Sequence, residues 1–206
     1  MRKTVLFCLL ALTLSPPAFA RTIVDDWSTV QAPPAPVLKP AAVDPKTTAL
    51  LILDIVRQGC NAERRPRCLD TLPAVHALLA RARTAGVMVG YSLVRGSTAA
   101  DILAPVAPVG GEPMVTSGTD KFLGTDLEAT LKAKGIKTVI ILGVVAQGAV
   151  LTTATEAALR GFEVVVPVDG VSSDQIYAEQ YTAWDLVNAP VIAGHVALTR
   201  SDLIQF

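Results

Sequence analysis

The chain has few metal-ligating residues, no excess of either charge and no long apolar run after its first residues. Its only histidines are His76 and His195, and it has three cysteines, which are too few ligands to suggest a metal site. We therefore expect no metal, and no organic cofactor is implied. Eighteen basic residues balance eighteen acidic ones. Without a basic stripe or an aromatic ladder, we expect no nucleic-acid partner.

The first twenty residues have the features of a cleavable signal peptide. Arg2 and Lys3 precede an apolar stretch at residues 5–14, and Ala18-Phe19-Ala20 has the small residues of a cleavage site. The apolar stretch is too short to span a bilayer, and no later stretch is long and apolar enough. We predict cleavage after Ala20 and a periplasmic or secreted protein with no membrane contact after cleavage. A retained N-terminal anchor is the alternative.

Two cysteines, Cys60 and Cys68, remain after that cleavage. Export places them in an oxidising compartment, where such a pair forms a disulfide. Closing so short a loop would stabilise the fold by about 2–3 kcal/mol if the gain is the lost entropy of the unfolded chain. Two thiols that do not pair are the alternative.

The next segment, residues 21–47, is an N-terminal arm that is rich in proline and alanine from residue 28 onward. This composition favours extended polyproline II and is incompatible with a helix interior or a central strand. We expect the arm to run over the surface or across a neighbouring subunit. Tyr177 and Trp184 are expected to cover the core, a subunit contact or a site wall, and we expect a homo-oligomer.

Patterns of buried strands and amphipathic helices alternate from residue 48 to the end of the chain. Residues 49–53, Ala-Leu-Leu-Ile-Leu, are a nearly continuous apolar run, typical of a parallel strand covered on both faces. The order predicts one domain, residues 48–206, of the α/β class: a three-layer α/β/α sandwich around a mainly parallel sheet. Further strands are expected at 87–94, 138–142 and 163–168, and helices at 72–85, 126–134, 148–160 and 173–188.

Two charged residues lie near predicted strand ends, where ligands bind in such sheets. Asp54 ends the first strand, where partial burial suits a carboxylate to acid or base catalysis; a helix cap or a structural ion pair is equally compatible. Lys121 lies in a loop before Thr125, a predicted helix N-cap that forms a capping box with Glu128. Lys121 either contacts a carboxylate or an anionic substrate, or is solvated at the surface.

The turn at residues 143–150 joins a buried strand to a helix. Backbone N–H groups at a helix N-terminus favour negative charge, so this turn could form an oxyanion hole. A turn whose glycines only allow close packing is the alternative.

Three motifs, in this order, resemble the isochorismatase-like hydrolase superfamily, which includes nicotinamidases, carbamoyl-sarcosine amidases and isochorismatases. Leu51-Ile52-Leu53-Asp54 is similar to the family's strand-end aspartate. Residues 122–127, Phe-Leu-Gly-Thr-Asp-Leu, are similar to the segment after its lysine loop. Residues 143–154, followed by Gly161-Phe162-Glu163-Val164, resemble its nucleophile turn and the strand behind it. The resemblance covers residues 48–198 and implies an isochorismatase-like, Rossmann-like fold.

The chain departs from the family at the nucleophile. Ala149 lies where the amidases have their cysteine, and a methyl group cannot attack a carbonyl, so no acyl-enzyme forms there. The turn is more similar to that of isochorismatases, with Gln147 in place of a histidine. The family lysine aligns with Thr116, so Lys121 takes its role only if the loop is rearranged.

The resemblance implies a hydrolase that acts on a small-molecule substrate without a cysteine nucleophile. A binding protein of the same fold that has lost catalysis is the alternative, which the missing cysteine favours. The expected site residues are Asp54 as general acid or base, Lys121 to orient it or to bind substrate, the Val145 and Ala149 amides to stabilise negative charge, and Phe122 and Gln147 to bind substrate.

Overall fold

The computed structural model describes residues 21–206, which fall into two compact units divided after Pro34. In the first unit, the single helical turn α1 spans Ile23–Asp26, and a 3-10 turn spans Trp27–Thr29. The predicted signal peptide, residues 1–20, lies outside the described residues. Within the described part of the chain, no helix is long and apolar enough to cross a membrane.

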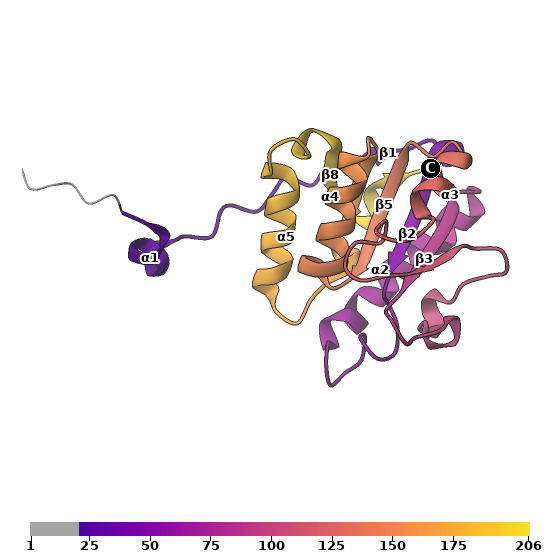
Figure 1. Ribbon diagram of the computed structural model, residues 1–206, viewed down its shortest axis with the longest axis horizontal. Helices are drawn as coiled ribbons and strands as arrows, with labels where there is room; N and C mark the ends of the chain where they lie inside the picture. The colour runs from indigo at the N-terminus through magenta and orange to yellow at the C-terminus, as the bar shows by residue number, and fades with distance from the viewer. Residues whose placement is uncertain (1–20) are drawn as a thin grey trace, which may run out of the picture. The chain divides into compact units, whose positions relative to one another are not determined.

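A seven-stranded sheet forms the centre of the second unit (Figure 1). Six strands lie in the order β4-β3-β2-β5-β6-β8, β7 pairs with β5, and every pair is parallel. All six side chains of β2 are buried, as expected for an apolar strand that is covered on both faces. The strands are β2 Thr48–Leu53, β3 Met88–Leu93, β4 Met114–Thr116, β5 Thr138–Val144, β6 Glu163–Pro167, β7 Val171–Ser172 and β8 Val196–Thr199.

Helices cover both faces of this sheet. Crossover connections between parallel strands are right-handed. The direction in which the chain moves along the sheet therefore decides which face of the sheet the connecting helix covers. The chain moves from β2 to β3 toward one edge and from β5 to β6 and β8 toward the other, so α2 lies on one face and α4 and α5 on the opposite face (Figure 1). The predicted three-layer sandwich is confirmed. The helices are α2 Pro66–Thr84, α3 Leu127–Ala133, α4 Leu151–Leu159 and α5 Ile176–Asn188.

Part of the proline-rich arm enters a sheet, which corrects the expectation that it only runs over a surface. β1, Ala41–Ala42, pairs in parallel with β9, Ile204–Gln205, to form a separate two-stranded sheet. The pairing is possible because the residues between Pro40 and Pro45 keep their backbone N–H groups. The segment from Ala35 onward therefore belongs to the main unit.

Three predicted helix starts are wrong. The helix expected from residue 72 begins at Pro66, because proline at the first helical position has a suitable φ and needs no acceptor for its nitrogen. The helix expected from residue 148 begins as α4 at Leu151, after the π-helical turn Ala146–Val150. Such single π-helical turns are frequent at functional sites. The helix expected from residue 173 begins at Ile176.

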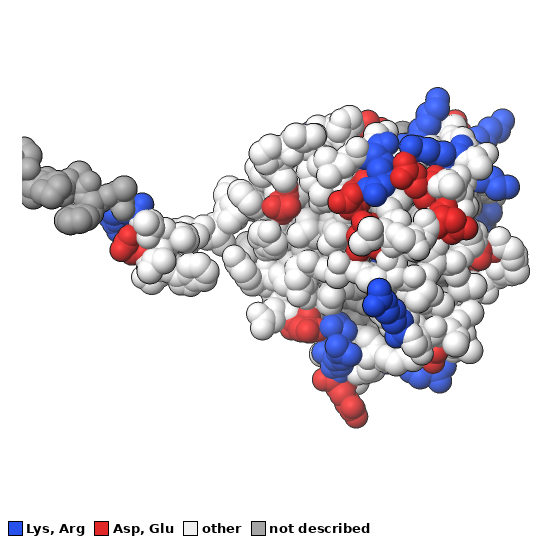
Figure 2. All heavy atoms as spheres, viewed as in Figure 1, with Lys and Arg blue, Asp and Glu red and all other residues white. Residues whose placement is uncertain are grey.

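Tyr177 and Trp184 do not cover the core. They are 72% and 42% exposed, because the side of α5 that is buried in the domain carries Thr182 and Leu186 instead. Figure 2 shows that charged side chains are sparse over α4 and α5. A subunit contact for these aromatic side chains stays a prediction.

Candidate functional site

A cavity lies where the order of strands reverses. The chain leaves β2 toward one edge of the sheet and leaves β5 toward the other, and ligands bind outside the carboxyl ends of strands at such a switch point. The cavity has a volume of about 490 Å³. Its wall includes Asp54, which follows β2, and Val144, Val145 and Ala149, from the end of β5 and the turn after it. The strand-end positions predicted from the sequence are therefore brought together.

The backbone is unusual at both strand ends. Asp54 has a φ of 56° and Gly143 a φ of 127°, which is the region that favours glycine. A Cβ atom at Gly143 would overlap the carbonyl oxygen of Leu53, its partner in β2. Glycine thus allows β2 and β5 to approach closely beside the cavity. The next peptide bond, between Val144 and Val145, is cis.

Asp54 is held by two polar side chains at the cavity wall. Its Oδ1 accepts a hydrogen bond from the Ser92 hydroxyl at 2.7 Å, and its Oδ2 lies 2.7 Å from the Lys121 ammonium nitrogen. Ser92 is the register partner of Leu53 in the neighbouring strand β3, so strand pairing places its hydroxyl beside Asp54. The carboxylate itself is 7% exposed. The sequence left open whether Asp54 is a catalytic acid or base or a structural residue such as a member of an ion pair. The ion pair is present, and Asp54 also lines the cavity.

Lys121 is fully buried, at 0% exposure, and therefore is not a solvated surface lysine. Its ammonium group donates a second hydrogen bond, of 2.7 Å, to the carbonyl oxygen of Gly118. Its backbone N–H donates to the hydroxyl of Thr153 on α4 at 3.3 Å. These contacts hold the lysine beside Asp54, and Lys121 is not among the residues that line the cavity.

The loop that carries Lys121 ends differently from the prediction. Asp126, rather than Thr125, is the N-cap of α3, and Asp126 makes no side-chain capping bond. The hydroxyl of Thr125 instead donates to the carbonyl oxygen of Lys121 at 2.6 Å. Glu128 does not complete a capping box, because its carboxylate pairs with Lys132 and Arg160. The threonine thus stabilises the lysine loop as well as the start of the helix.

The structure does not bring Phe122 or Gln147 to the cavity wall. Phe122 is 4% exposed, and its ring stacks on that of Phe162 with 6.1 Å between centroids. Burial of its apolar ring in the core explains this position. The side chain of Gln147 is outside the cavity lining and accepts a hydrogen bond of 2.7 Å from the Ser173 hydroxyl. Neither side chain is therefore placed at the cavity, and the substrate-binding role expected for these two residues stays a prediction.

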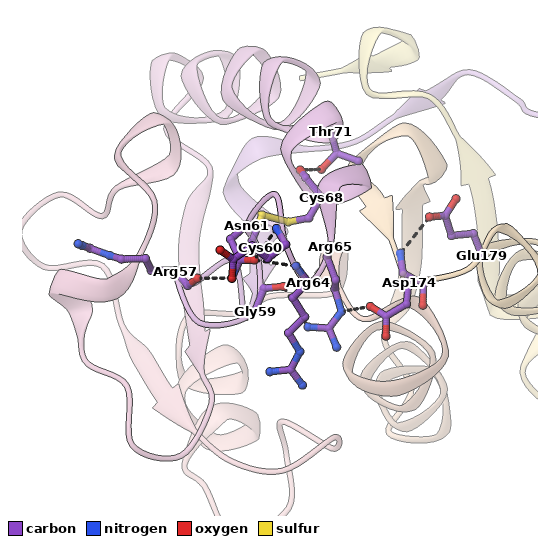
Figure 3. The surroundings of a disulfide bond; sticks show 12 residues. Arg57, Gly59, Cys60, Asn61, Arg64, Arg65, Cys68, Thr71, Asp174 and Glu179 are labelled. Atoms are coloured by element: carbon purple, nitrogen blue, oxygen red, sulfur yellow. Dashed lines mark hydrogen bonds and ion pairs between the residues drawn. A yellow bond between two sulfur atoms is a disulfide. The ribbon is translucent and has the colours of Figure 1, made fainter.

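The predicted disulfide between Cys60 and Cys68 is confirmed, with 5.4 Å between the two Cα atoms (Figure 3). It ties the first turn of α2 to the loop that follows β2 and Asp54. Both cysteines are buried, at 1% and 0% exposure. Neither thiol is therefore available as a nucleophile.

Sequence reasoning missed four residues of the site. Ser92 lies within β3, near the carboxyl end of the strand beside β2, and this position is the signal that could have found it. The others are cavity-lining arginines: Arg95 follows β3, and Arg64 and Arg65 lie between the two cysteines. No pattern in the sequence identifies these three arginines. Within residues 21–206, no group of three or more His, Cys, Asp or Glu residues could hold a metal.

Comparisons with known proteins agree with this geometry. A family model described as the isochorismatase domain matches residues 48–195. The streptothricin hydrolase of Streptomyces noursei is 30% identical over 164 residues, which are 74% of this chain and 56% of that protein, little more than half its length. A secreted isochorismatase effector of Verticillium dahliae is 27% identical over 151 residues, 66% of this chain and 78% of that protein.

Solved structures share the fold. The crystal structure of an isochorismatase family protein from Desulfovibrio vulgaris superposes with a TM-score of 0.68 at 22% identity, over 76% of this chain and 95% of that chain.

Proposed function

Because the chain belongs to the isochorismatase family of hydrolases, we propose that it is an exported enzyme that hydrolyses a small molecule by acid–base chemistry at Asp54, without a cysteine nucleophile. The position of Asp54 carries this proposal. Its carboxylate is at the wall of a cavity and is held in place by Ser92 and the buried Lys121. A group fixed in this way is suited to proton transfer, which depends on alignment with the reacting atom.

The contacts of Asp54 leave it able to accept a proton. Each carboxylate oxygen has two lone pairs, and Ser92 and Lys121 each use one. In hydrolysis, Asp54 would take a proton from water as the water oxygen bonds to the electrophilic atom of the substrate, and would return that proton to the leaving group. For a vinyl ether, a protonated Asp54 would instead first donate its proton to the alkene carbon, and it would then take a proton from the water that adds to the oxocarbenium carbon. Lys121 is a positioning residue, because it is fully buried behind Asp54.

The turn after β5 would stabilise negative charge during this reaction. Val145 and Ala149 line the cavity, and the π-helical turn runs directly into α4. Backbone N–H groups at the start of a helix attract developing negative charge, and fixed donors aimed at a transition-state anion are among the strongest contributions to catalysis. The proposed role of the turn needs only backbone groups, so alanine at position 149 does not prevent it.

Export is supported by the disulfide and by the secreted relative. Structural disulfides persist in oxidising compartments and are rare in the cytosol, and the Cys60–Cys68 bond is buried in the fold. The Verticillium dahliae relative is described as secreted. We therefore assign the protein to the periplasm or the exterior of the cell.

A binding protein without catalysis is the second candidate. Ala149 lies at the cavity wall, where the amidases of the family have their nucleophile, and no cysteine lines the cavity. Such a chain could bind the small molecule without changing it. The same cavity serves both candidates, so only a measurement of turnover separates them.

The test is the variant Asp54→Asn, which has nearly the same shape and cannot carry the proton. Against a panel of small amides and vinyl ethers, followed by chromatography of the products, the variant should lose at least about a hundredfold in rate. The matched control is Asp169→Asn, since Asp169 is hydrogen bonded to Ser201 and does not line the cavity. A folded Asp54→Asn protein with full activity would rule out this mechanism. A wild-type protein that binds panel members without converting them would favour the second candidate.

A further inference from the structure

The cavity wall has more positively than negatively charged side chains. Three arginines line the wall, Arg64, Arg65 and Arg95, and Asp54 is the only acidic residue among the lining residues. The negative charge of Asp54 is already compensated by Lys121, at 2.7 Å. The remaining charge of the wall is therefore positive.

Of the three arginines, Arg65 is held by contacts with other residues of the protein. Its side chain is 11% exposed, and its Nε lies 2.5 Å from Asp174, although the two groups are not aligned as a hydrogen bond. Its Nη1 donates to the carbonyl oxygen of Gly59 at 3.0 Å. Asp174 compensates part of its charge, so the excess positive charge of the wall comes mainly from the other two arginines.

Arg64 and Arg95 differ from every other arginine of the described chain. Within residues 21–206, every other arginine side chain contacts a carboxylate or a backbone carbonyl oxygen, whereas those of Arg64 and Arg95 contact neither. Both of these exposed guanidinium groups line the same cavity. Two exposed cations that line one cavity without a protein acceptor are the arrangement expected of a site that receives an anion.

A disulfide-closed loop places Arg64 at the cavity. The bond between Cys60 and Cys68 closes the loop, and the side chain of Asn61 accepts hydrogen bonds from the backbone N–H groups of Glu63 and Arg64 at 3.1 and 2.8 Å. Figure 3 shows the side chains of Arg64 and Arg65 leaving this loop on the side opposite the disulfide. The guanidinium of Arg64 is thus carried on a rigid support, which reduces the entropy lost on binding.

We propose that Arg64 and Arg95, with Arg65 beside them, form an anion subsite, and that the substrate class of the cavity is small organic molecules with a carboxylate or phosphate group. The guanidinium group binds such oxyanions through two parallel hydrogen bonds. The apolar residues of the cavity lining, Val94, Val144, Val145 and Ala149, provide a surface for the rest of the molecule. The inference rests on the proposed function in that it concerns the same cavity.

Binding of three probes to the intact, disulfide-bonded protein tests the subsite. Benzoate and phenyl phosphate carry the two oxyanion groups, and benzamide is the neutral analogue of benzoate. Titration followed by two-dimensional NMR should give a Kd for at least one anion about tenfold lower than for benzamide, since hydrogen bonds to charged groups are worth that much. The double variant Arg64→Ala/Arg95→Ala should raise the Kd of that anion about tenfold or more and leave that of benzamide unchanged.

Arg57→Ala is the matched control. Arg57 is in the same connection after β2, but its guanidinium donates to the carbonyl oxygen of Ala100, and Figure 3 shows it extending away from Arg64. This variant removes one arginine charge from the same connection, where the double variant removes two, and it should keep the wild-type affinity for anions. Equal affinities for benzamide and both anions, no loss of affinity in the double variant, an equal loss in Arg57→Ala, or no binding of either anion would overturn the subsite.

The test of the anion subsite can fail or succeed independently of the test of the proposed hydrolase activity, because it measures binding without turnover. Anion binding that is lost in the double variant, in a protein that hydrolyses nothing, would support the subsite and refute the enzyme. Hydrolysis that depends on Asp54, in a protein whose affinity for anions is unchanged in the double variant, would support the enzyme and refute the subsite.

Discussion

Replacement of only one member of the ion pair between Asp54 and Lys121 should lower the free energy of unfolding. Lys121 has 0% exposure, so Lys121→Met would leave the Asp54 carboxylate without its compensating charge. Removal of one partner from a buried ion pair destabilises a fold by about 3–5 kcal/mol. We expect this loss in the free energy of unfolding, measured in urea. The double variant Asp54→Asn/Lys121→Met, which has neither charge, should recover part of it.

A surface pair provides the comparison for this prediction. Lys132 is paired with Glu128 one helical turn away, and its side chain is 58% exposed. Lys132→Met should leave the free energy of unfolding nearly unchanged, because exposed pairs contribute little. Equal effects of the Lys121 and Lys132 variants would show that the Asp54 carboxylate does not depend on its buried partner.

Single residues of the site were predictable to different degrees. Asp54 could be placed because an apolar run of strand length ends directly before it, and strand ends converge at one edge of a parallel sheet. The contact of Lys121 with Asp54 was one of several possibilities that the sequence left open, because the path of an irregular loop leaves no periodic pattern in a sequence. Arg64 and Arg95 gave no signal for the same reason: an exposed arginine in a connection has no partner that spacing could identify.

Among the elements, the close approach of β2 and β5 should make Gly143 irreplaceable. The Cβ of Gly143→Ala would overlap the backbone of Leu53, and neither strand can move without breaking its pairing. We expect a loss of more than about 4 kcal/mol in the free energy of unfolding, in the range that only severe backbone or core damage reaches. Thermal unfolding followed by circular dichroism would measure it.

Gly111→Ala separates overlap from backbone strain. Gly111 also has a positive φ, of 89°, but nothing lies within 4 Å of the added Cβ. The variant should lose only about 1–2 kcal/mol, the cost of the left-handed conformation for an alanine. If both glycine variants lost the same amount, the strands would have room to separate beside the cavity.

The existence and order of the elements were predictable, whereas several of their ends were not. Short, nearly continuous apolar runs identified β2, β3, β5 and β6, because strands buried on both faces need apolar side chains on both. The start of α2 was missed by six residues, since its first turn follows the disulfide loop and has few apolar residues. The π-helical turn before α4 has no sequence signature of its own, so it was included in the helix.

For the whole molecule, we expect the exported protein to begin at Arg21 and to contain no free thiol. Signal cleavage after Ala20 removes Cys8, and the two remaining cysteines form the disulfide. Mass spectrometry of protein recovered from the periplasm or the medium gives its N-terminus, and thiol titration after denaturation without reductant counts the cysteines. Two reactive thiols in that sample would contradict the disulfide, and a mass that includes residues 1–20 would contradict cleavage.

The predicted homo-oligomer is tested on the same sample by light scattering after size-exclusion chromatography. A molar mass equal to that of one chain would refute it.

The pairing of β2 with β5 also determines when the cavity can appear. Leu53 pairs with Gly143, across nearly half of the chain, and the residue after each of them, Asp54 and Val144, lines the cavity. Contacts between residues so far apart form slowly, because the entropy of closing the intervening loop is lost before the contacts can compensate for it. Ligand recognition is therefore acquired late in folding. For a chain exported as we propose, this delay is favourable, because the polypeptide would cross the membrane before the proposed ligand site is complete.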